Sequence, residues 1–482
     1  MLDNIVDSAP EVTAQTAGHR PLVGILGTDR AKKLLLIVGD VFVLYVSLFL
    51  TLSIQGRDSL SFPVWASALV PFTLLFAGWI VVFYIADLYE IAISKNEVRF
   101  YSRLLKVVWL NCILSAACFK LSTSTLLDFP AWTLAIFGVG SSFAFALWRY
   151  RYNAFVEQPA LQRNVLVVGL NEGARELLEE IARNPQVGYR IAAVVSSNTD
   201  DFSLPGAAIY DDSVNVKQLL VQENISTVVT AFDPRNNTRL LRQLFDSLAL
   251  KIQFLELPTF YERLTGKIPV NNIGHIWFLE NLAQSDKTLH DFFKRALDLV
   301  FSTLLLLVAL PFIPFVVLAI KLDSKGPVLF FQTRVGLLGR PFTAIKFRTM
   351  RVEAESDGVA RWAQKNDPRI TRVGRLLRKT RIDEIPQLWN VLRSEMSVIG
   401  PRPERPEFVR NLEQDIPFYN ERHLVKPGLT GWAQVRFRYG SSVADSFKKL
   451  EYDFYYIKNR SIPLDVAILL KTVSIVLCGG GQ

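Results

Sequence analysis

Four long apolar stretches occupy the first 150 residues, and they constrain the fold more than any other feature of the sequence. A helix of about 20 apolar residues crosses the ~30 Å hydrocarbon core of a bilayer. We therefore predict a four-helix transmembrane N-terminal bundle within residues 31–150. It is preceded by a disordered tail at residues 1–30, which lacks the pattern of a signal peptide. The four stretches are residues 34–54, 64–84, 104–121 and 129–148.

The composition supports a membrane protein. Half of the residues are hydrophobic, 21% are charged and the mean hydropathy is +0.23, whereas a soluble globular protein has about 25% charged residues. Three cysteines are too few for a disulfide framework, and four scattered histidines do not predict a zinc site. Basic residues flank the apolar stretches so that the positive-inside rule places the N-terminus and everything after Arg149 in the cytoplasm. Asp40, inside the first stretch, is expected to pair with a basic neighbour.

Residues 163–270 predict a Rossmann-like domain. Strand patterns at 164–169, 189–195, 227–232 and 252–258 alternate with helical segments, which is typical of a parallel α/β sheet. The first turn has Gly169 and Gly173 but not the full G-x-G-x-x-G, so the dinucleotide motif is weak. Two interpretations stay open: a regulatory or structural module, and a site for a nucleotide-type ligand.

A fifth apolar run, residues 299–320, has no charge. It is long enough to span a membrane, but basic residues on both flanks favour the cytoplasm, and Pro311 and Pro314 interrupt a helix. We predict a re-entrant membrane helix over residues 294–321 that breaks at Pro311. An ordinary fifth span is the alternative.

An acidic pair follows a basic helix in the last third of the chain. Residues 371–380 contain four basic and no acidic residues and lead into Asp383 and Glu384. Pro386 suits the first turn of a helix, so the pair lies at or near a helix start. It could bind Mg²⁺, or provide a phosphoryl nucleophile with a low pKa beside the cations. It could also merely cap the helix, which spacing alone favours.

Arg402 lies in a Pro–Arg–Pro unit. The two prolines fix the backbone, and a guanidinium binds phosphate through two parallel hydrogen bonds, although a rigid surface loop has the same pattern. Aromatic and basic residues at 452–465 are typical of a membrane interface. We expect no nucleic-acid partner, because the apolar helices make that interpretation poor.

Five motifs in order carry a resemblance to a known family. They are KFRTM, RKTRIDEIPQLWNVL, SVIGPRP, KPGLTGWAQV and the YD–YYIKN–LD ending. They resemble the bacterial sugar transferase family, the monotopic polyprenyl-phosphate hexose-1-phosphate transferases. The motifs lie between about residue 292 and the end, and the first 290 residues resemble the large form of the family more loosely. The resemblance makes residues 290–482 a mainly helical catalytic domain.

The resemblance implies that a hexose-1-phosphate passes from a UDP-sugar to undecaprenyl phosphate, releasing UMP, through a covalent aspartyl-phosphosugar intermediate. The resemblance makes this the expected first membrane step of exopolysaccharide, capsule or O-antigen synthesis, at the bacterial cytoplasmic (inner) membrane. The sugar would be glucose, galactose or an N-acetylated hexose; no residue decides among them, and the usual role of the large form favours glucose or galactose. Inner-membrane lipids would be partners, and so would a second copy of the chain in a homodimer. A degenerate membrane scaffold, and a second nucleotide-sugar-modifying enzyme in the middle domain, are the rival hypotheses.

The resemblance also assigns residues. Asp383 would be the nucleophile and a Mg²⁺ ligand, and Glu384 would support the metal or position Asp383. The family's Ser–Pro break in the re-entrant helix corresponds to Leu310 and Pro311, which removes a hydroxyl and keeps the proline. The substrate phosphates would be bound by Arg378, Arg402, Lys346 and Arg348.

Overall fold

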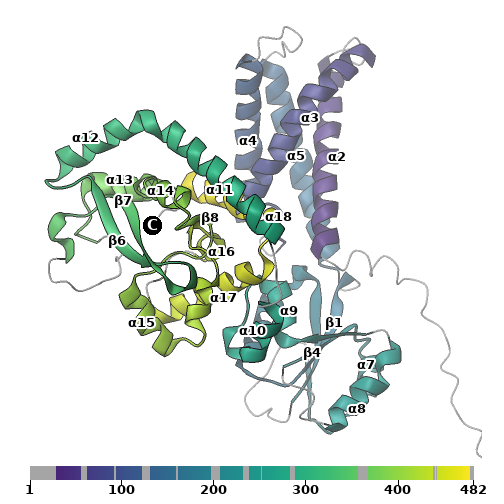
Figure 1. Ribbon diagram of the computed structural model, residues 1–482. Coiled ribbons are helices and arrows are strands. Elements are labelled where there is room, and N and C mark those ends of the chain that lie inside the picture. Colours follow the sequence, from purple (N-terminus) through teal and green to yellow (C-terminus); the bar gives the residue numbers. More distant parts are fainter. Residues whose placement is uncertain are drawn as a thin grey trace, which may run out of the picture.

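The computed structural model describes residues 29–55, 62–91, 94–121, 131–158, 161–196, 207–231, 238–250, 252–282, 288–355, 367–437, 440 and 442–477. In chain order these form a bundle of four helices, a parallel sheet covered by helices, and a mainly helical part that contains the acidic pair (Figure 1). The predicted tail lies outside the described residues except for its last two positions.

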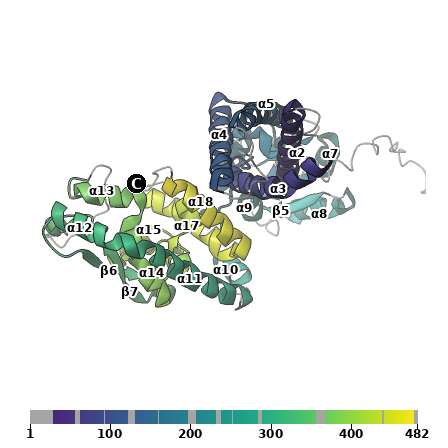
Figure 2. The ribbon, with the colours of Figure 1, turned by 90° about the horizontal axis from the view of Figure 1, so that it is seen from above.

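The bundle has one helix for each of the four predicted stretches. Figure 2 shows the helices gathered side by side. Their shared core is rich in aromatic rings, such as Phe76 stacked on Phe137, yet Phe42 and Leu74 point outward and are about two-thirds or more exposed. Helices that are apolar on all sides suit a membrane. The helices are α2 (Asp29–Gln55), α3 (Phe62–Ile85), α4 (Val98–Leu121) and α5 (Ala131–Val156).

Three helices within the described residues are long and apolar enough to cross a membrane: Ala31–Ile54, Val98–Lys120 and Thr288–Asp323. The apolar segment Leu69–Ile85 of α3 is shorter. The membrane character of the chain is therefore supported, while four crossings stay a prediction.

A buried ion pair joins α2 to α5. Arg149 donates from Nη2 to Oδ2 of Asp40 at 2.6 Å and from Nη1 to the carbonyl of Leu88 at 2.8 Å. Neither charged side chain has any exposed surface. The predicted pairing of Asp40 with a basic neighbour is confirmed, and Arg149 on α5 joins α2 to the segment that follows α3.

The middle domain is a five-stranded parallel sheet with strand order β3-β2-β1-β4-β5. Alternate residues of β1 enter two different cores: Val165 and Val167 face α6 and α9, and Leu166 and Val168 face α7 and α8. The Rossmann-like prediction is confirmed. The strands are β1 (Arg163–Val168), β2 (Tyr189–Val195), β3 (Ala208–Tyr210), β4 (Thr227–Thr230) and β5 (Gln253–Glu256). The helices are α6 (Glu172–Arg183), α7 (Val216–Gln222), α8 (Thr238–Asp246) and α9 (Leu257–Thr265).

The start of α6, where this fold binds phosphates, contacts the chain itself. A Cβ on Gly173 would lie 2.2 Å from Oδ1 of Asn272, so a larger residue at this position would displace the Asn272 side chain. Asn272 ends the short 3-10 helix η7 (Val270–Asn272), whose neighbours Ile268 and Ile273 enter the core of the last domain. Residues 268–273, which connect the middle domain to the last domain, therefore pack against both.

The last domain is mainly helical, as predicted, with two small sheets. An antiparallel hairpin pairs β6 (Leu329–Val335) with β7 (Pro341–Phe347), and β8 (Ser397–Ile399) pairs with β9 (Gly428–Thr430) in parallel. The helices around them are α10 (His275–Asn281), α13 (Arg372–Thr380), α14 (Gln387–Leu392), α15 (Pro406–Asp415), α16 (Trp432–Arg436), α17 (Val443–Asn459) and α18 (Ile462–Leu477).

The fifth apolar run forms an arch over this domain (Figure 1). Helix α11 (Thr288–Ala309) changes into the 3-10 turn η8 (Leu310–Phe312) and continues as α12 (Ile313–Asp323). The regular α-helix is thus interrupted at Pro311, the predicted position, because proline cannot donate to the preceding turn.

Both ends of the arch bond to neighbouring parts of the same domain. At the start, Arg295 donates to the carbonyls of Val391 and Leu392 at 2.7 and 2.9 Å. At the end, the amide of Val373 donates to Oδ2 of Asp323 at 2.9 Å. The start of the arch thus lies against the end of α14, and its end against the start of α13.

Candidate active site

The acidic pair lies in a tight turn between α13 and α14. Arg381 ends α13 in the left-handed region, with φ of 60°, and its amide returns to the carbonyls of Leu377 and Arg378. The chain then forms the 3-10 turn η11 (Ile382–Glu384) before α14 begins. The prediction that the pair lies near a helix start is confirmed.

Close packing of α13 against the end of the hairpin orients Arg378. A Cβ on Gly374 would lie 2.1 Å from the carbonyl oxygen of Thr349, so only glycine permits this approach. One helical turn later, Arg378 donates from Nε to Oγ1 of Thr349 at 2.9 Å. The guanidinium is thereby held on the side of α13 that faces the acidic pair, and its charge acts on Asp383.

Glu384 is surrounded by cations. Its Oε1 accepts from Lys346 Nζ at 3.0 Å and from Arg402 Nη2 at 2.8 Å, and its Oε2 accepts from Arg381 Nη1 at 3.4 Å. Burial would raise the pKa of Glu384, but the charges of these three partners outweigh it and hold the pKa well below its usual range. Glu384 is therefore a fixed anion that organises three positive groups.

Asp383 differs from its neighbour. It is 7% exposed, and no described residue forms a hydrogen bond or ion pair with its carboxylate. Burial, followed by the negative charge of Glu384, raises the pKa of Asp383 to about 6, although Lys346, Arg378 and Arg402 oppose the rise. The expectation of a low pKa for this carboxylate is wrong, because burial and the adjacent anion outweigh the cations.

Four predicted phosphate-binding residues separate into two groups. Lys346, Arg378 and Arg402 lie around the acidic pair. Arg348 does not bond to it: this buried side chain donates from Nη1 to the carbonyl of Lys325 at 3.0 Å and from Nη2 to the carbonyl of Ser324 at 2.8 Å. These bonds fix the chain just after α12, so the structure assigns Arg348 to the base of the arch.

The sequence interpretation missed several charged residues near the site. Arg381 directly follows the basic run of residues 371–380, so that run could have indicated it. Arg334 lies on β6 and donates to the carbonyl of Pro403 at 3.0 Å. Arg422 and Asp453 form a buried ion pair at 2.7 Å. Arg422 also bonds to residues 401–404, the Arg402 loop, through the carbonyl of Arg402. No local sequence pattern indicates Arg334, Arg422 or Asp453, because these residues come together only in the folded chain.

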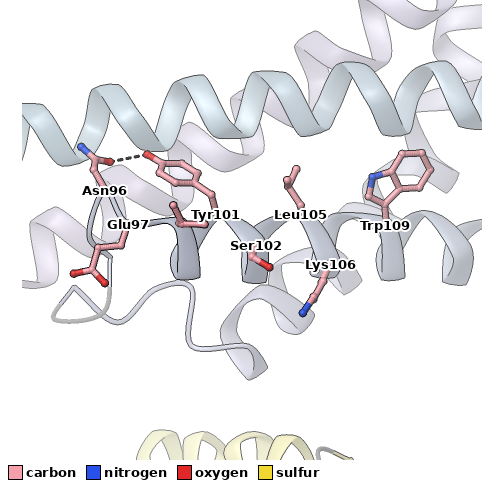
Figure 3. Close-up of a pocket in the computed structure, with 8 residues that line it drawn as sticks. Asn96, Glu97, Tyr101, Ser102, Leu105, Lys106 and Trp109 are labelled. Carbon is pink, nitrogen blue, oxygen red and sulfur yellow. Dashed lines mark hydrogen bonds between the residues drawn. The ribbon is translucent and has the colours of Figure 1, made fainter.

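A groove of about 650 Å³ lies elsewhere, along α4 (Figure 3). At one end of the groove, the hydroxyl of Tyr101 donates to Oδ1 of Asn96 at 2.6 Å. Every residue that lines it comes from α4 or the two positions before it, and none belongs to the predicted site. The lining residues are Asn96, Glu97, Val98, Tyr101, Ser102, Leu105, Lys106 and Trp109. The acidic pair is thus identified by its charged groups and not by a cavity.

Glu90 connects the helix bundle to the last domain, which contains the acidic pair. It follows α3 and accepts from Arg436 at 3.1 Å and from Lys471 at 3.3 Å. Although burial raises it, these two cations hold the pKa of Glu90 at about 2. The middle domain is tied as well, since Trp432 donates to the carbonyl of Gly266 at 2.9 Å. Helices α16 and α18 therefore join the site domain to the rest of the chain.

Comparisons with known proteins agree with this geometry. The N-acetylgalactosaminephosphotransferase of Aeromonas hydrophila, which is named for UDP-N-acetylgalactosamine and undecaprenyl phosphate, is 44% identical over 220 residues, 46% of this chain and 51% of the relative. The UDP-glucose:undecaprenyl-phosphate glucose-1-phosphate transferase of Escherichia coli K12 is 33% identical over 320 residues, 65% of this chain and 67% of the relative. An exopolysaccharide production protein of Rhizobium leguminosarum is 46% identical over 186 residues, 37% of this chain and 92% of the relative.

The chain thus spans about half the length of the first relative and about two-thirds of the second. The family described as bacterial sugar transferase matches residues 289–479, which include the arch except for its first residue, the acidic pair and every described residue that bonds to Glu384. The chain belongs to the bacterial sugar transferase family.

Proposed function

We propose that this protein transfers a hexose-1-phosphate from a UDP-sugar to undecaprenyl phosphate and releases UMP. This would be the first membrane step of exopolysaccharide, capsule or O-antigen synthesis. The relatives' names support the reaction class, since two are phosphotransferases that act on undecaprenyl phosphate and a third is named for exopolysaccharide production.

One observation carries the proposal. Of two adjacent carboxylates, Glu384 accepts hydrogen bonds from three cations, while Asp383 has none from any described residue. A nucleophile needs lone pairs that are not engaged, and a poorly solvated carboxylate is more reactive than a hydrated one. Asp383 therefore suits attack on phosphorus, and Glu384 suits support.

The proposed chemistry has two displacements. An oxygen of Asp383 attacks the sugar-bearing phosphorus of the UDP-sugar, and the bond from that phosphorus to the bridging oxygen breaks, so that UMP leaves with the bond's electron pair. A phosphate oxygen of undecaprenyl phosphate then attacks the same phosphorus and frees the Asp383 carboxylate. The product is the lipid diphosphate sugar, and atoms and charge balance.

Phosphoryl transfer depends mainly on positioning and on neutralising charge. Lys346, Arg378 and Arg402 surround the acidic pair, so their charges would act on the equatorial phosphate oxygens as the bonds change. Arg402 has the most exposed side chain of the residues bonded to Glu384, at 38%, and is the one best placed to meet an incoming diphosphate. We assign Arg378 and Lys346 to the same task.

Magnesium fits Asp383 better than Glu384. Mg²⁺ takes oxygen ligands and is held by one or two carboxylates together with substrate phosphates. The Asp383 oxygens have no N–H donor from the described residues, whereas Oε1 of Glu384 has two donors and Oε2 has one. No group of three His, Cys, Asp or Glu that could hold a metal occurs among the described residues. Mg²⁺ would be held by Asp383 and the substrate, with Glu384 contributing charge, and would neutralise the diphosphate.

The arch suits a re-entrant membrane helix. Its central part is almost entirely unburied by protein, and its two ends bond to the same domain through Arg295 and Asp323. A helix that crossed the bilayer would have to place those ends on opposite sides. We propose that the arch enters the cytoplasmic leaflet of the bacterial inner membrane and returns, so that the acidic pair lies where the lipid acceptor's phosphate emerges. The middle and catalytic domains would then be cytoplasmic, below a multi-pass bundle.

The sugar is open, because the relatives' names divide between glucose and N-acetylgalactosamine. The test is UMP release by the detergent-purified full chain with undecaprenyl phosphate and a panel of UDP-glucose, UDP-galactose and their N-acetylated forms. We expect release with at least one donor and none in Asp383→Asn. Asp415→Asn changes an exposed acid at the end of α15 and should keep the full rate. Absence of UMP with every donor would contradict the proposal and favour a scaffold.

A further inference from the structure

The Arg402 loop is held in an unusual way. Pro401 and Pro403 flank Arg402 and have no N–H, so the loop can form few hydrogen bonds from its own amides. The loop is held through its carbonyl groups instead. Four consecutive carbonyls each accept a hydrogen bond from a different residue. The bonds are Gly428 N to Pro401 O at 2.9 Å, Arg422 Nη2 to Arg402 O at 3.1 Å, Arg334 Nη1 to Pro403 O at 3.0 Å, and Val335 N to Glu404 O at 2.9 Å.

Arg422 holds the central carbonyl from a buried position. It is 5% exposed and lies in the 3-10 helix η12 (Tyr419–Leu424). Its Nε and Nη2 both donate to Oδ2 of Asp453, at 3.1 and 2.7 Å, and its Nη1 donates to the hydroxyl of Tyr419 at 2.6 Å. Nη2 is shared between Asp453 and the carbonyl of Arg402. The carboxylate of Asp453 on α17 therefore sets where that nitrogen points.

The same loop positions a group that bonds to the acidic pair. Arg402 donates from Nη2 to Oε1 of Glu384 at 2.8 Å, and that oxygen also accepts from Lys346. A continuous series of hydrogen bonds thus runs from Asp453 through Arg422 and the Arg402 backbone to Glu384. Neither Arg422 nor Asp453 bonds to Asp383 or Glu384.

We propose that Asp453 and Arg422 are positioning residues: they fix the Arg402 backbone so that its guanidinium stays against Glu384, where the sugar-bearing phosphate reacts. This inference rests on the proposed function and assigns two further residues to it. A buried ion pair often contributes little net stability. The role that we assign to this pair is therefore to fix the position of the Arg402 backbone. Displacement of a reacting or charge-stabilising group by about 1 Å can cost about 100-fold in rate.

Arg422→Lys tests the proposal directly. Lysine keeps the positive charge beside Asp453 but lacks the planar fork that reaches both the carboxylate and the carbonyl. We expect kcat for UMP release to fall roughly 10- to 100-fold, with a smaller change in the KM for the UDP-sugar. Tyr419→Phe is the matched control, since it removes a bond to the same guanidinium that does not reach the loop, and it should change kcat by less than about threefold.

A double-mutant cycle separates positioning from a general structural role. If Arg422 acts only through Arg402, then Arg402→Lys with Arg422→Lys should be within about twofold of Arg402→Lys alone. If the two losses multiply, Arg422 acts independently of Arg402, and the proposal is overturned.

Hydrogen exchange tests the same link without enzymatic activity. The amides of Val335 and Gly428 donate to the loop carbonyls, so a released loop should let both exchange faster in Arg422→Lys than in wild type and in Tyr419→Phe. Unchanged exchange in Arg422→Lys would overturn the positioning role whether or not the wild type releases UMP. A wild type without UMP release but with faster exchange in the variant would reject the reaction and retain the structural link.

Discussion

Arg402 donates from Nη2 to Oε1 of Glu384 over 2.8 Å, across 18 residues of sequence. The same oxygen accepts from Lys346, so one carboxylate oxygen holds two cations from different elements beside Asp383. Because the charge of Glu384 is used in this way, its neighbour keeps its own lone pairs. The proposed roles of the two adjacent acids, Asp383 as nucleophile and Glu384 as support, rest on this contact.

Glu384→Gln should impair both activity and stability. The change leaves Lys346, Arg381 and Arg402 without their shared anion, and loss of such electrostatic organisation lowers kcat by about 100-fold or more. The free energy of unfolding should fall by about 1–3 kcal/mol, since buried donors lose a charged acceptor. UMP release and thermal unfolding measure the two effects. Glu413→Gln, an exposed acid on α15, is the control, and a wild-type rate in Glu384→Gln would refute the role.

Arg348→Lys should change stability and leave substrate affinity alone. The Arg348 guanidinium bonds to the carbonyls of Ser324 and Lys325 at the end of the arch, so lysine should cost about 1–2 kcal/mol of stability. The KM for the UDP-sugar should change by less than about threefold. Arg378→Lys, measured in parallel, should lower kcat/KM strongly. A large rise in KM for Arg348→Lys would return that residue to the phosphate site.

Asp40→Ala should destabilise the bundle. Asp40 and Arg149 have no exposed surface, and removing one partner of a buried ion pair costs about 3–5 kcal/mol because the other charge is left uncompensated. Thermal aggregation in detergent measures the effect. The joint replacement Asp40→Leu with Arg149→Met should recover part of the loss, and equal stability of Asp40→Ala and wild type would argue against the pairing.

Stability should also depend on Glu451. This side chain is 5% exposed on α17, and burial raises its pKa to about 7, with Lys267 opposing the rise and Glu176 adding to it. As the pH rises from about 4.5 to 7, the unfolded chain has released a proton that the folded protein retains, so stability falls, by on the order of 3 kcal/mol in total.

Glu451→Gln cannot release that proton. Its melting temperature should therefore rise relative to wild type as the pH increases from about 5 to 8. Thermal unfolding at several pH values measures the difference, and parallel curves for the two proteins would contradict the assignment.

Features that are local in the sequence were predictable. The apolar stretches and the strand–helix alternation depend on neighbouring residues, and each appears where it was expected. The 3-10 turn at Leu310–Phe312 lies at the predicted proline, while re-entry into the membrane stays a prediction. The acidic pair followed by Pro386 likewise indicated a helix start. These elements form because their own side-chain periodicity selects them.

Features that depend on the packing of distant segments could not be predicted from the sequence. Lys346 and Arg348 lie two residues apart, so the period of a strand would place both on one face; β7 ends at Phe347, and Arg348 turns to the arch. Asp453 lies 51 residues from Arg402, and only the packing of α17 behind η12 brings them together. Burial of Asp383 reverses its expected pKa for the same reason.

The most direct test of the central claim is a search for the covalent intermediate. The full chain is incubated with the UDP-sugar that supports UMP release, without undecaprenyl phosphate, and its peptides are examined by mass spectrometry. We expect a hexose phosphate on Asp383 together with a burst of one UMP per protein, and loss of both in Asp383→Asn. An unmodified Asp383, with UMP formed only when the lipid acceptor is present, would contradict the account.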